Sequence, residues 1–192
     1  MNSIHVSSDF PYWIISFDQL SSGSRNLRLC GGWGTPFHEI ISSRLNLSKF
    51  NLVDTIKKVA EKDTPFLGIC LGLQLLFEKS DETPGAEGLG ILKGEILRIP
   101  PKEGLKIPHM GWNSLNIKPQ ARLFDGIANN SYVYFVHSYY LKAADENIVA
   151  ASTEYSTHIH ASVESGNIFA CQFHPEKSSD VGLRILKNFA SL

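Results

Sequence analysis

A short apolar run that ends in a Gly-x-Cys-x-Gly turn and passes directly into a helical pattern constrains this chain more than any other segment. The run covers residues 65–69, the turn holds Gly68, Cys70 and Gly72, and the helical pattern follows over residues 72–79. A strand, a sharp turn and a helix in this order form a nucleophile elbow, here with cysteine in place of serine. The start of a helix favours the thiolate form of such a side chain. We therefore expect a covalent nucleophile at Cys70.

Composition and charge narrow the classes of function that this chain can have. The chain has 192 residues and 43% hydrophobic residues, so we expect one domain over residues 1–192 with a full core. A net charge of −1 favours neither nucleic acid nor an anionic membrane as a partner. Cys30, Cys70 and Cys171 show neither a disulfide framework nor zinc-site spacing. We expect a cytoplasmic protein with no membrane span, no metal and no cofactor.

The periodicity of apolar residues indicates an α/β core followed by a series of strands. Ser165-Gly166 has the composition of a tight turn, so the strands on either side of it should form a hairpin. Trp13-Ile14-Ile15 is the only clear strand candidate among the first fifty residues. The other expected elements are helices over 51–61, 72–79 and 179–191, a loop over 83–90, and strands over 65–69, 91–99, 112–117, 132–139, 148–152, 158–164 and 167–173.

A second segment supplies the groups that a cysteine nucleophile needs, a base and a residue that orients the base. His174 follows directly after a predicted strand, and Pro175 stops that strand. Glu176 lies two residues beyond His174, so a turned backbone can bring its carboxylate to one imidazole nitrogen while the other nitrogen faces Cys70. The sequence therefore predicts a Cys–His–Glu triad.

These two segments, residues 68–74 and 172–178, together resemble the class I (triad) glutamine amidotransferases. Residues 85–90, 106–113 and 134–140 are similar to the glutaminase subunits of imidazole glycerol phosphate synthases. The resemblance covers about residues 45–192, which leaves residues 1–45 atypical and 46–192 matching the family. It implies a flavodoxin-like three-layer α/β fold with an antiparallel extension, in which the N-terminal strands are incomplete.

The resemblance also assigns roles to single residues. Cys70 would attack the side-chain amide of L-glutamine, and His174, oriented by Glu176, would protonate the departing ammonia and then activate water. Gln74 would contact the substrate, and the backbone around residues 137–139 would hold its α-amino and carboxylate groups. The substrate-binding residues implied in this way are Leu71, Gly72, Gln74, His137, Ser138 and Tyr139.

A partner subunit is implied as well. In the family, ammonia passes to a (β/α)8-barrel cyclase and reacts there with a phosphorylated ribulosyl imidazole intermediate. The products are imidazole glycerol phosphate and the aminoimidazole carboxamide nucleotide AICAR, in histidine biosynthesis. The resemblance therefore implies a heterodimer, and the positions that match residues near the partner are His109, Trp112, Asn113, Tyr134 and Lys177.

The N-terminal third departs from the family pattern. Residues 23–28 echo the first family turn and residues 32–37 echo a later loop, but only three residues separate them where the family has further strands and a helix. That loop, with Gly32-Trp33-Gly34, would supply one backbone donor of an oxyanion hole, and the Leu71 N–H would supply the other. The segment is either rearranged or the product of an error in reading frame or start site.

Two other functions stay open on the sequence. The first is a paralogous amidotransferase that supplies ammonia to a sugar-modifying enzyme of surface polysaccharide synthesis. The second is a catalytically impaired docking subunit, which the atypical N-terminus favours.

Among single residues, His137 can equally be a core histidine. His158 and His160 have the spacing of exposed strand histidines rather than of a complete metal site.

Overall fold

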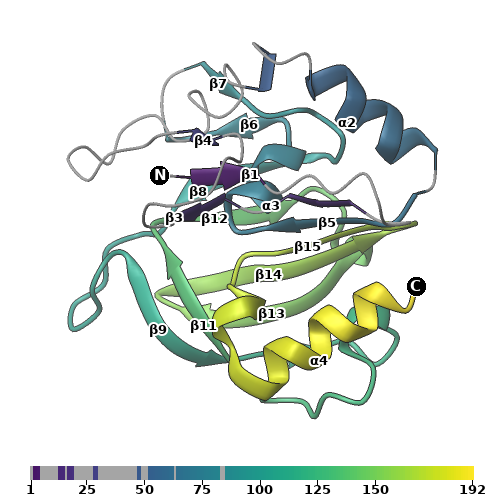
Figure 1. The fold of residues 1–192 in the computed structure, drawn as a ribbon. Coiled ribbons are helices and arrows are strands. Elements are labelled where there is room, and N and C mark those ends of the chain that lie inside the picture. Colours follow the sequence, from purple (N-terminus) through teal and green to yellow (C-terminus); the bar gives the residue numbers. More distant parts are fainter. Residues whose placement is uncertain are drawn as a thin grey trace.

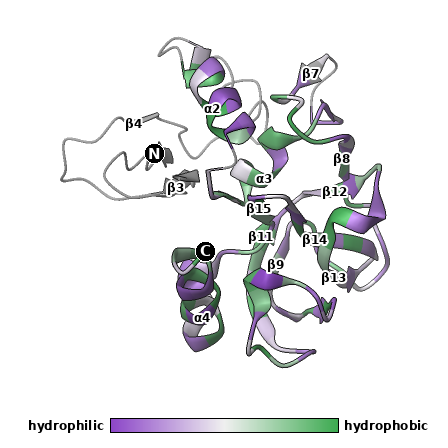
Figure 2. Cartoon of the chain, turned by 90° about the vertical axis from the view of Figure 1, so that its right-hand side faces the viewer, coloured by the Kyte–Doolittle hydropathy of each residue, from purple (hydrophilic) through white to green (hydrophobic). Residues whose placement is uncertain are grey.

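The computed structural model describes residues 2–4, 13–15, 17–19, 28–29, 47–48, 52–62, 64–82 and 85–192. Figure 1 shows a central sheet with helices on both faces. Helices α2 (Leu52–Glu61) and α3 (Leu71–Leu76) lie on one side, and α4 (Ser179–Ala190) lies on the other. The side view in Figure 2 shows the same separation. The expected α/β class is confirmed.

The main sheet is mixed, with both parallel and antiparallel strand pairs. Its strand order is β2-β5-β15-β14-β12-β8-β6-β7, with β13 pairing β14 and β10 pairing β13. Strand β5 pairs in parallel with β2 and β15, whereas β15, β14, β12 and β8 pair antiparallel in succession. The bounds are β2 Trp13–Ile15, β5 Phe66–Ile69, β6 Lys79–Ser80, β7 Ala86–Glu87, β8 Gly94–Arg98, β10 Asn116–Ile117, β12 Tyr139–Ala143, β13 Val149–Tyr155, β14 Thr157–Ser165 and β15 Ile168–Cys171.

Two smaller sheets complete the strand set of the described residues. Strands β9 (His109–Ser114) and β11 (Tyr132–His137) form an antiparallel ribbon, and β1 (Asn2–Ile4) pairs with β3 (Phe17–Gln19) and β4 (Arg28–Leu29). Short 3-10 turns are η1 (Arg122–Phe124), η2 (Glu146–Ile148) and η3 (Pro175–Lys177).

Strand β5 shows why the sheet is covered on both faces. All four of its residues are buried, and successive side chains on a strand point to opposite faces. Phe66 packs in the cluster that contains Ile56 of α2, while Leu67 joins the cluster that contains Ile185 of α4. A strand buried in this way lies inside the molecule, so the residue after it is held by packing from two sides.

The predicted elements are present with local differences. Trp13–Ile15 is strand β2, and the hairpin at Ser165-Gly166 joins β14 to β15. The helix expected over 72–79 is wrong in its bounds, since α3 spans Leu71–Leu76 and β6 follows it. The segment expected to be a loop over 83–90 contains the short strand β7, whose partner β6 is also too short for a clear period-2 pattern.

Candidate active site

Cys70 lies in the sharp turn between β5 and α3. Its φ of 53° is a conformation that L-residues rarely adopt, so the turn carries backbone strain. The Cys70 N–H donates to the Cys171 carbonyl at 2.8 Å, and the Gln74 N–H donates to the Cys70 carbonyl at 3.2 Å. A Cβ atom on Gly68 would lie 2.8 Å from the backbone of Gly72, so the strand passes the helix at a distance that only glycine allows. The predicted strand–turn–helix is confirmed.

His174 reaches the same edge of the sheet from the neighbouring strand. Strands β5 and β15 pair in parallel, with Ile69 opposite Cys171, so their carboxyl ends lie side by side. Cys70 follows the first strand and His174 comes three residues after the second. The His174 Nδ1 atom lies 2.7 Å from Glu176 Oε1, a hydrogen bond formed within the turn η3. The structure thus brings the three residues of the predicted triad together.

The turn that carries His174 is locked by a buried hydroxyl. Ser178 Oγ donates to the His174 carbonyl at 2.7 Å and accepts the Tyr134 N–H at 2.9 Å, and the His174 N–H donates to the Tyr134 carbonyl at 2.9 Å. Helix α4 packs against this turn so closely that a Cβ atom on Gly182 would lie 1.8 Å from the Pro175 carbonyl oxygen. The imidazole is therefore held by β11, α4 and its own turn.

The electrostatics of the triad favour a charged imidazole. Burial lowers the pKa of His174, but its hydrogen bonds with Cys70 and Glu176 and the charges of these residues outweigh burial and raise that pKa to about 10. Burial raises the pKa of Glu176, but its hydrogen bond with His174 and the charge of that ring outweigh this and lower it. The arrangement suits an imidazolium that is hydrogen-bonded to the Glu176 carboxylate and lies beside Cys70.

Gln172 is a site residue that the sequence reasoning missed. It is fully buried, its Nε2 atom donates to Cys70 Sγ at 3.7 Å, and its Oε1 atom accepts from Gln74 Nε2 at 3.2 Å. Gln74 Nε2 also donates to the Tyr139 carbonyl at 3.2 Å. Gln172 lies two residues before His174, in the same segment as the His-Pro-Glu motif. That position is the signal that could have found it.

Two of the expected substrate-binding residues, His137 and Tyr139, are joined to this amide pair by hydrogen bonds. Leu71, Gly72 and Gln74 lie on α3 directly after the nucleophile. Ser138 separates β11 from β12, so the chain leaves the ribbon there and enters the main sheet, and Tyr139 opens β12. His137 is buried, and its Nδ1 atom lies 2.8 Å from the Tyr139 carbonyl. Its ring therefore faces the protein interior.

The residues expected near a partner divide into two groups. Trp112 is 52% exposed, Lys177 is exposed, and Trp112 packs edge-to-face on the partly buried Tyr134 across the ribbon. His109 is only 3% exposed, because it lies on the opposite face of β9 between aromatic rings. The side chain of Asn113 follows His109 on that inner face and donates to the Glu154 carbonyl.

Several expectations concern residues outside the described ranges. The loop Gly32-Trp33-Gly34 and Cys30 lie there. Among the described residues, no cluster of three or more His, Cys, Asp and Glu side chains could hold a metal ion, and no helix has the length and apolarity to cross a membrane. His160 is buried and accepts the Ala143 N–H, so the expectation of two exposed histidines is wrong for His160 and confirmed for His158.

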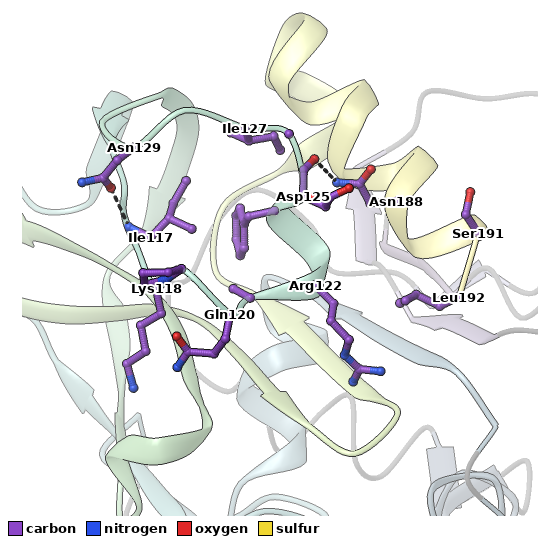
Figure 3. Close-up of a pocket in the computed structure, with 14 residues that line it drawn as sticks. Ile117, Lys118, Gln120, Arg122, Asp125, Ile127, Asn129, Asn188, Ser191 and Leu192 are labelled. Carbon is purple, nitrogen blue, oxygen red and sulfur yellow. Dashed lines mark hydrogen bonds between the residues drawn. The ribbon is translucent and has the colours of Figure 1, made fainter.

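A cavity of about 770 Å³ lies away from the triad residues, beside α4, β10 and η1 (Figure 3). Its cationic groups are already engaged, since Lys118 donates to the Glu146 carbonyl and Arg122 donates to the Gly166 carbonyl. None of its lining residues belongs to the candidate site. The lining consists of Ile117, Lys118, Pro119, Gln120, Ala121, Arg122, Phe124, Asp125, Gly126, Ile127, Asn129, Asn188, Ser191 and Leu192.

Comparison with known proteins places the chain in a family. The family "Glutamine amidotransferase class-I" matches residues 14–191. Imidazole glycerol phosphate synthase subunit HisH of Aquifex aeolicus is 44% identical over 180 residues, which cover 94% of this chain and 84% of the relative. The HisH subunit of Caldanaerobacter subterraneus is 52% identical over 146 residues, or 76% of this chain and 71% of the relative. HisH 1 of Methanococcus maripaludis is 42% identical over 190 residues, which cover 99% of this chain and 88% of the relative.

Solved structures agree on the fold. PurLQS from Thermotoga maritima superposes with a TM-score of 0.61 at 20% identity, covering 97% of this chain and 82% of that chain. A crystal structure of a glutamine amidotransferase superposes with a TM-score of 0.59 at 19% identity, covering 81% of this chain and 77% of that chain. Identities this low show the fold alone, whereas the sequence relatives show the family. The chain belongs to the class I glutamine amidotransferases, and within them to the HisH subunits of imidazole glycerol phosphate synthase.

Proposed function

We propose that this chain hydrolyses glutamine to glutamate and ammonia through a thioester on Cys70, and passes the ammonia to a cyclase subunit in histidine biosynthesis. The observation that carries the proposal is the meeting of Cys70 with the His174–Glu176 pair at the carboxyl ends of two adjacent parallel strands. Membership of the HisH family supports the substrate and the pathway.

The reaction uses the triad twice. The Cys70 thiolate attacks the side-chain amide carbon of glutamine, and the His174 imidazolium gives its proton to the amide nitrogen as ammonia leaves. The resulting thioester is attacked by water, whose proton returns to the now neutral His174. The thiolate departs, glutamate is released, and the thiolate–imidazolium pair is restored. Glu176 holds the ring through Nδ1, so that Nε2 is the atom that exchanges the proton.

Substrate binding and charge stabilisation come from the groups around the elbow. Gln74 contacts the bound glutamine, and the backbone of residues 137–139 holds its α-amino and carboxylate groups. The Leu71 N–H donates to the oxyanion of the tetrahedral intermediate, and the loop Gly32-Trp33-Gly34 donates the second hydrogen bond. One such donor contributes roughly 3–4 kcal/mol of transition-state stabilisation.

The partner of this subunit is a (β/α)8-barrel cyclase that docks on the outer face of the β9–β11 ribbon. Met110, Trp112 and Tyr132 are exposed there, an unusual group of large apolar side chains for one ribbon face. The exposed aromatic residues have the chemistry of interface anchors. Lys177, exposed beside the triad turn, and Tyr134 extend this surface toward the active site. The buried ring of His109 takes no part in the contact.

We expect the chain alone to hydrolyse glutamine poorly, and to become active when mixed with the cognate cyclase and its phosphorylated ribulosyl imidazole ligand. Glutamate release in a coupled assay measures this. Trp112→Ala should raise the cyclase concentration needed for half-maximal stimulation by at least about tenfold, as truncation of a buried interface tryptophan does. The matched control is Leu183→Ala on α4, another exposed apolar residue.

Three outcomes separate the candidate functions. Stimulation by the cyclase supports the histidine pathway. Hydrolysis that the cyclase leaves unchanged would favour a different ammonia acceptor, such as a sugar-modifying enzyme. Binding of the cyclase without any hydrolysis would reject the enzymatic proposal in favour of a docking subunit.

A further inference from the structure

Two histidines outside the triad face each other across the β9–β11 ribbon. His109 and His137 are directly opposite in the strand register and are 3% and 5% exposed. The His109 ring is stacked between Phe135, at a centroid distance of 4.7 Å, and Tyr155, at 3.9 Å. Nothing in the triad chemistry uses either ring, so the burial of this polar pair requires its own explanation.

The pair forms one continuous chain of hydrogen bonds. His137 Nδ1 lies 2.8 Å from the Tyr139 carbonyl oxygen, and His109 Nδ1 lies 3.0 Å from His137 Nε2. Asn113 Nδ2 lies 3.5 Å from His109 Nε2. The chain thus runs from β9 through both rings to the first residue of β12.

The direction of every bond in this chain is determined. A carbonyl only accepts, so His137 Nδ1 must carry a hydrogen, and its Nε2 atom, as a neutral ring, accepts from His109 Nδ1. The Asn113 amide is oriented by donation to the Glu154 carbonyl at 3.0 Å and by acceptance of the Ser114 N–H at 2.8 Å. Its Nδ2 atom therefore donates to His109 Nε2. Both rings are neutral and share one tautomer.

Burial agrees with this assignment. It lowers the pKa of His109 to about 4, and it lowers the pKa of His137 to about 3 against the opposing effect of the Tyr139 carbonyl. If either ring were charged, both of its nitrogens would carry a hydrogen. Its Nε2 atom would then face another N–H donor, and the chain of hydrogen bonds would be broken. The two histidines therefore act as fixed hydrogen-bond donors.

The receiving end of the chain is also a contact of the active site. The Tyr139 carbonyl accepts Gln74 Nε2 at 3.2 Å as well as His137 Nδ1, so both of its lone pairs are used. Gln74 Nε2 reaches Gln172 Oε1 at the same time, and Gln172 donates to Cys70 Sγ. The orientation of one carbonyl thus connects the histidine pair to the amide that lies beside the nucleophile.

We propose that His109 and His137 are positioning residues that hold the Tyr139 carbonyl, and through it the Gln74 side chain, in the orientation that binds glutamine. This inference rests on the proposed glutaminase function and adds two residues to its binding machinery. A group that contacts substrate equally in the ground state and the transition state affects KM and leaves kcat unchanged. Loss of the pair should therefore appear in KM for glutamine.

The central variant is His137→Phe, assayed in the complex with the cyclase. Phenylalanine fills the space of the ring but donates nothing to the Tyr139 carbonyl. We expect KM for glutamine to rise by about five- to tenfold, with kcat within about twofold of the wild type, as the loss of one buried hydrogen bond predicts. A steady-state glutamate-release assay, with active sites counted by a glutamine-analogue electrophile, separates the two constants.

A second pair of variants keeps the test decisive if His137→Phe fails to fold. His109→Phe preserves the stack on Phe135 and Tyr155 but removes the donor to His137, so KM should rise by about two- to fivefold. His109→Gln restores an N–H donor and should return KM to within about twofold of the wild type. His160→Phe is the matched control, because it replaces another buried strand histidine whose ring is hydrogen-bonded to the Ala143 N–H and not to the Tyr139 carbonyl.

Each result decides the inference. A rise in KM that His109→Gln reverses and His160→Phe does not reproduce supports it. Unchanged KM in both the His137→Phe and His109→Phe variants would overturn it, and so would a fall in kcat at constant KM, which marks a purely structural role. Failure of the proposed function looks different, since the wild type would then be inactive or Cys70→Ala would be active.

Discussion

Replacement of Cys70 by alanine will abolish glutamine hydrolysis and leave the chain folded. Removing the nucleophile of a catalytic triad costs about 10⁶-fold in kcat where it has been measured, so we expect a loss of at least ~10⁴-fold here. Alanine and cysteine are equally strained at a φ of 53°, so the replacement should leave the elbow in place. The measurement is glutamate release in the complex with the cyclase, with circular dichroism as a check of folding.

Cys171→Ala is the matched control for this experiment. Cys171 is fully buried on β15, and its side chain packs in the core on the α4 side of the sheet. Truncation there should cost stability of about 1 kcal/mol and retain hydrolysis. Equal activity of the wild type and Cys70→Ala would reject the covalent mechanism.

Replacement of His174 by glutamine will remove the proton donor for the leaving ammonia. The base of a triad is as indispensable as its nucleophile, so we expect a loss of at least ~10³-fold in kcat. His158→Gln is the control, because His158 is exposed on β14, where its ring pairs with Glu154 and lies edge-on to His160, away from the triad. Retention of more than a tenth of the wild-type activity in His174→Gln would contradict the assigned role.

The same variant tests the charge of the imidazole. A pKa raised from 6.5 to about 10 stabilises the folded state fully below pH 6.5, and this contribution is lost as the pH rises through about 10. The difference in free energy of unfolding between wild type and His174→Gln should therefore be largest near pH 6 and shrink toward pH 10. Urea denaturation across this range measures it, and a difference independent of pH would contradict the raised pKa.

The parts of the site that were predictable from the sequence are those built by local chain geometry. The elbow at Cys70 depends on Gly68 and Gly72 within a few residues, and the His174–Glu176 bond forms within one short turn. The pairing of the two segments then follows from adjacent parallel strands, whose carboxyl ends meet at one edge.

The rest depends on contacts between distant strands. His109 and His137 meet only because β9 and β11 form a ribbon in a register that places them opposite each other, and neither residue has a local motif. Gln172 reaches Cys70 across 102 positions of sequence. Short strands such as β6 and β7 are likewise formed by pairing rather than by propensity. This explains why the helix expected over 72–79 extends past the end of α3 and into β6.

The N-terminal third shows a different limit. Only β2, with three consecutive apolar residues, had a recognisable pattern, and it is the strand that pairs with β5 next to the elbow. Strands β1, β3 and β4 form a sheet of their own, and their few residues carry no clear alternation. The expected oxyanion loop lies outside the described residues, so the second oxyanion donor stays a prediction.

The most direct test of the account is covalent labelling of the wild-type complex by a glutamine-analogue electrophile, followed by peptide mass spectrometry. The elbow predicts one adduct, on the peptide that contains Cys70, formed only when the cyclase is present and prevented by excess glutamine. Cys171 is an internal control, since burial raises the pKa of its thiol and keeps it unreactive. An adduct on Cys171 or Cys30 instead of Cys70, or no adduct under conditions that support glutamine hydrolysis, would contradict Cys70 as the nucleophile.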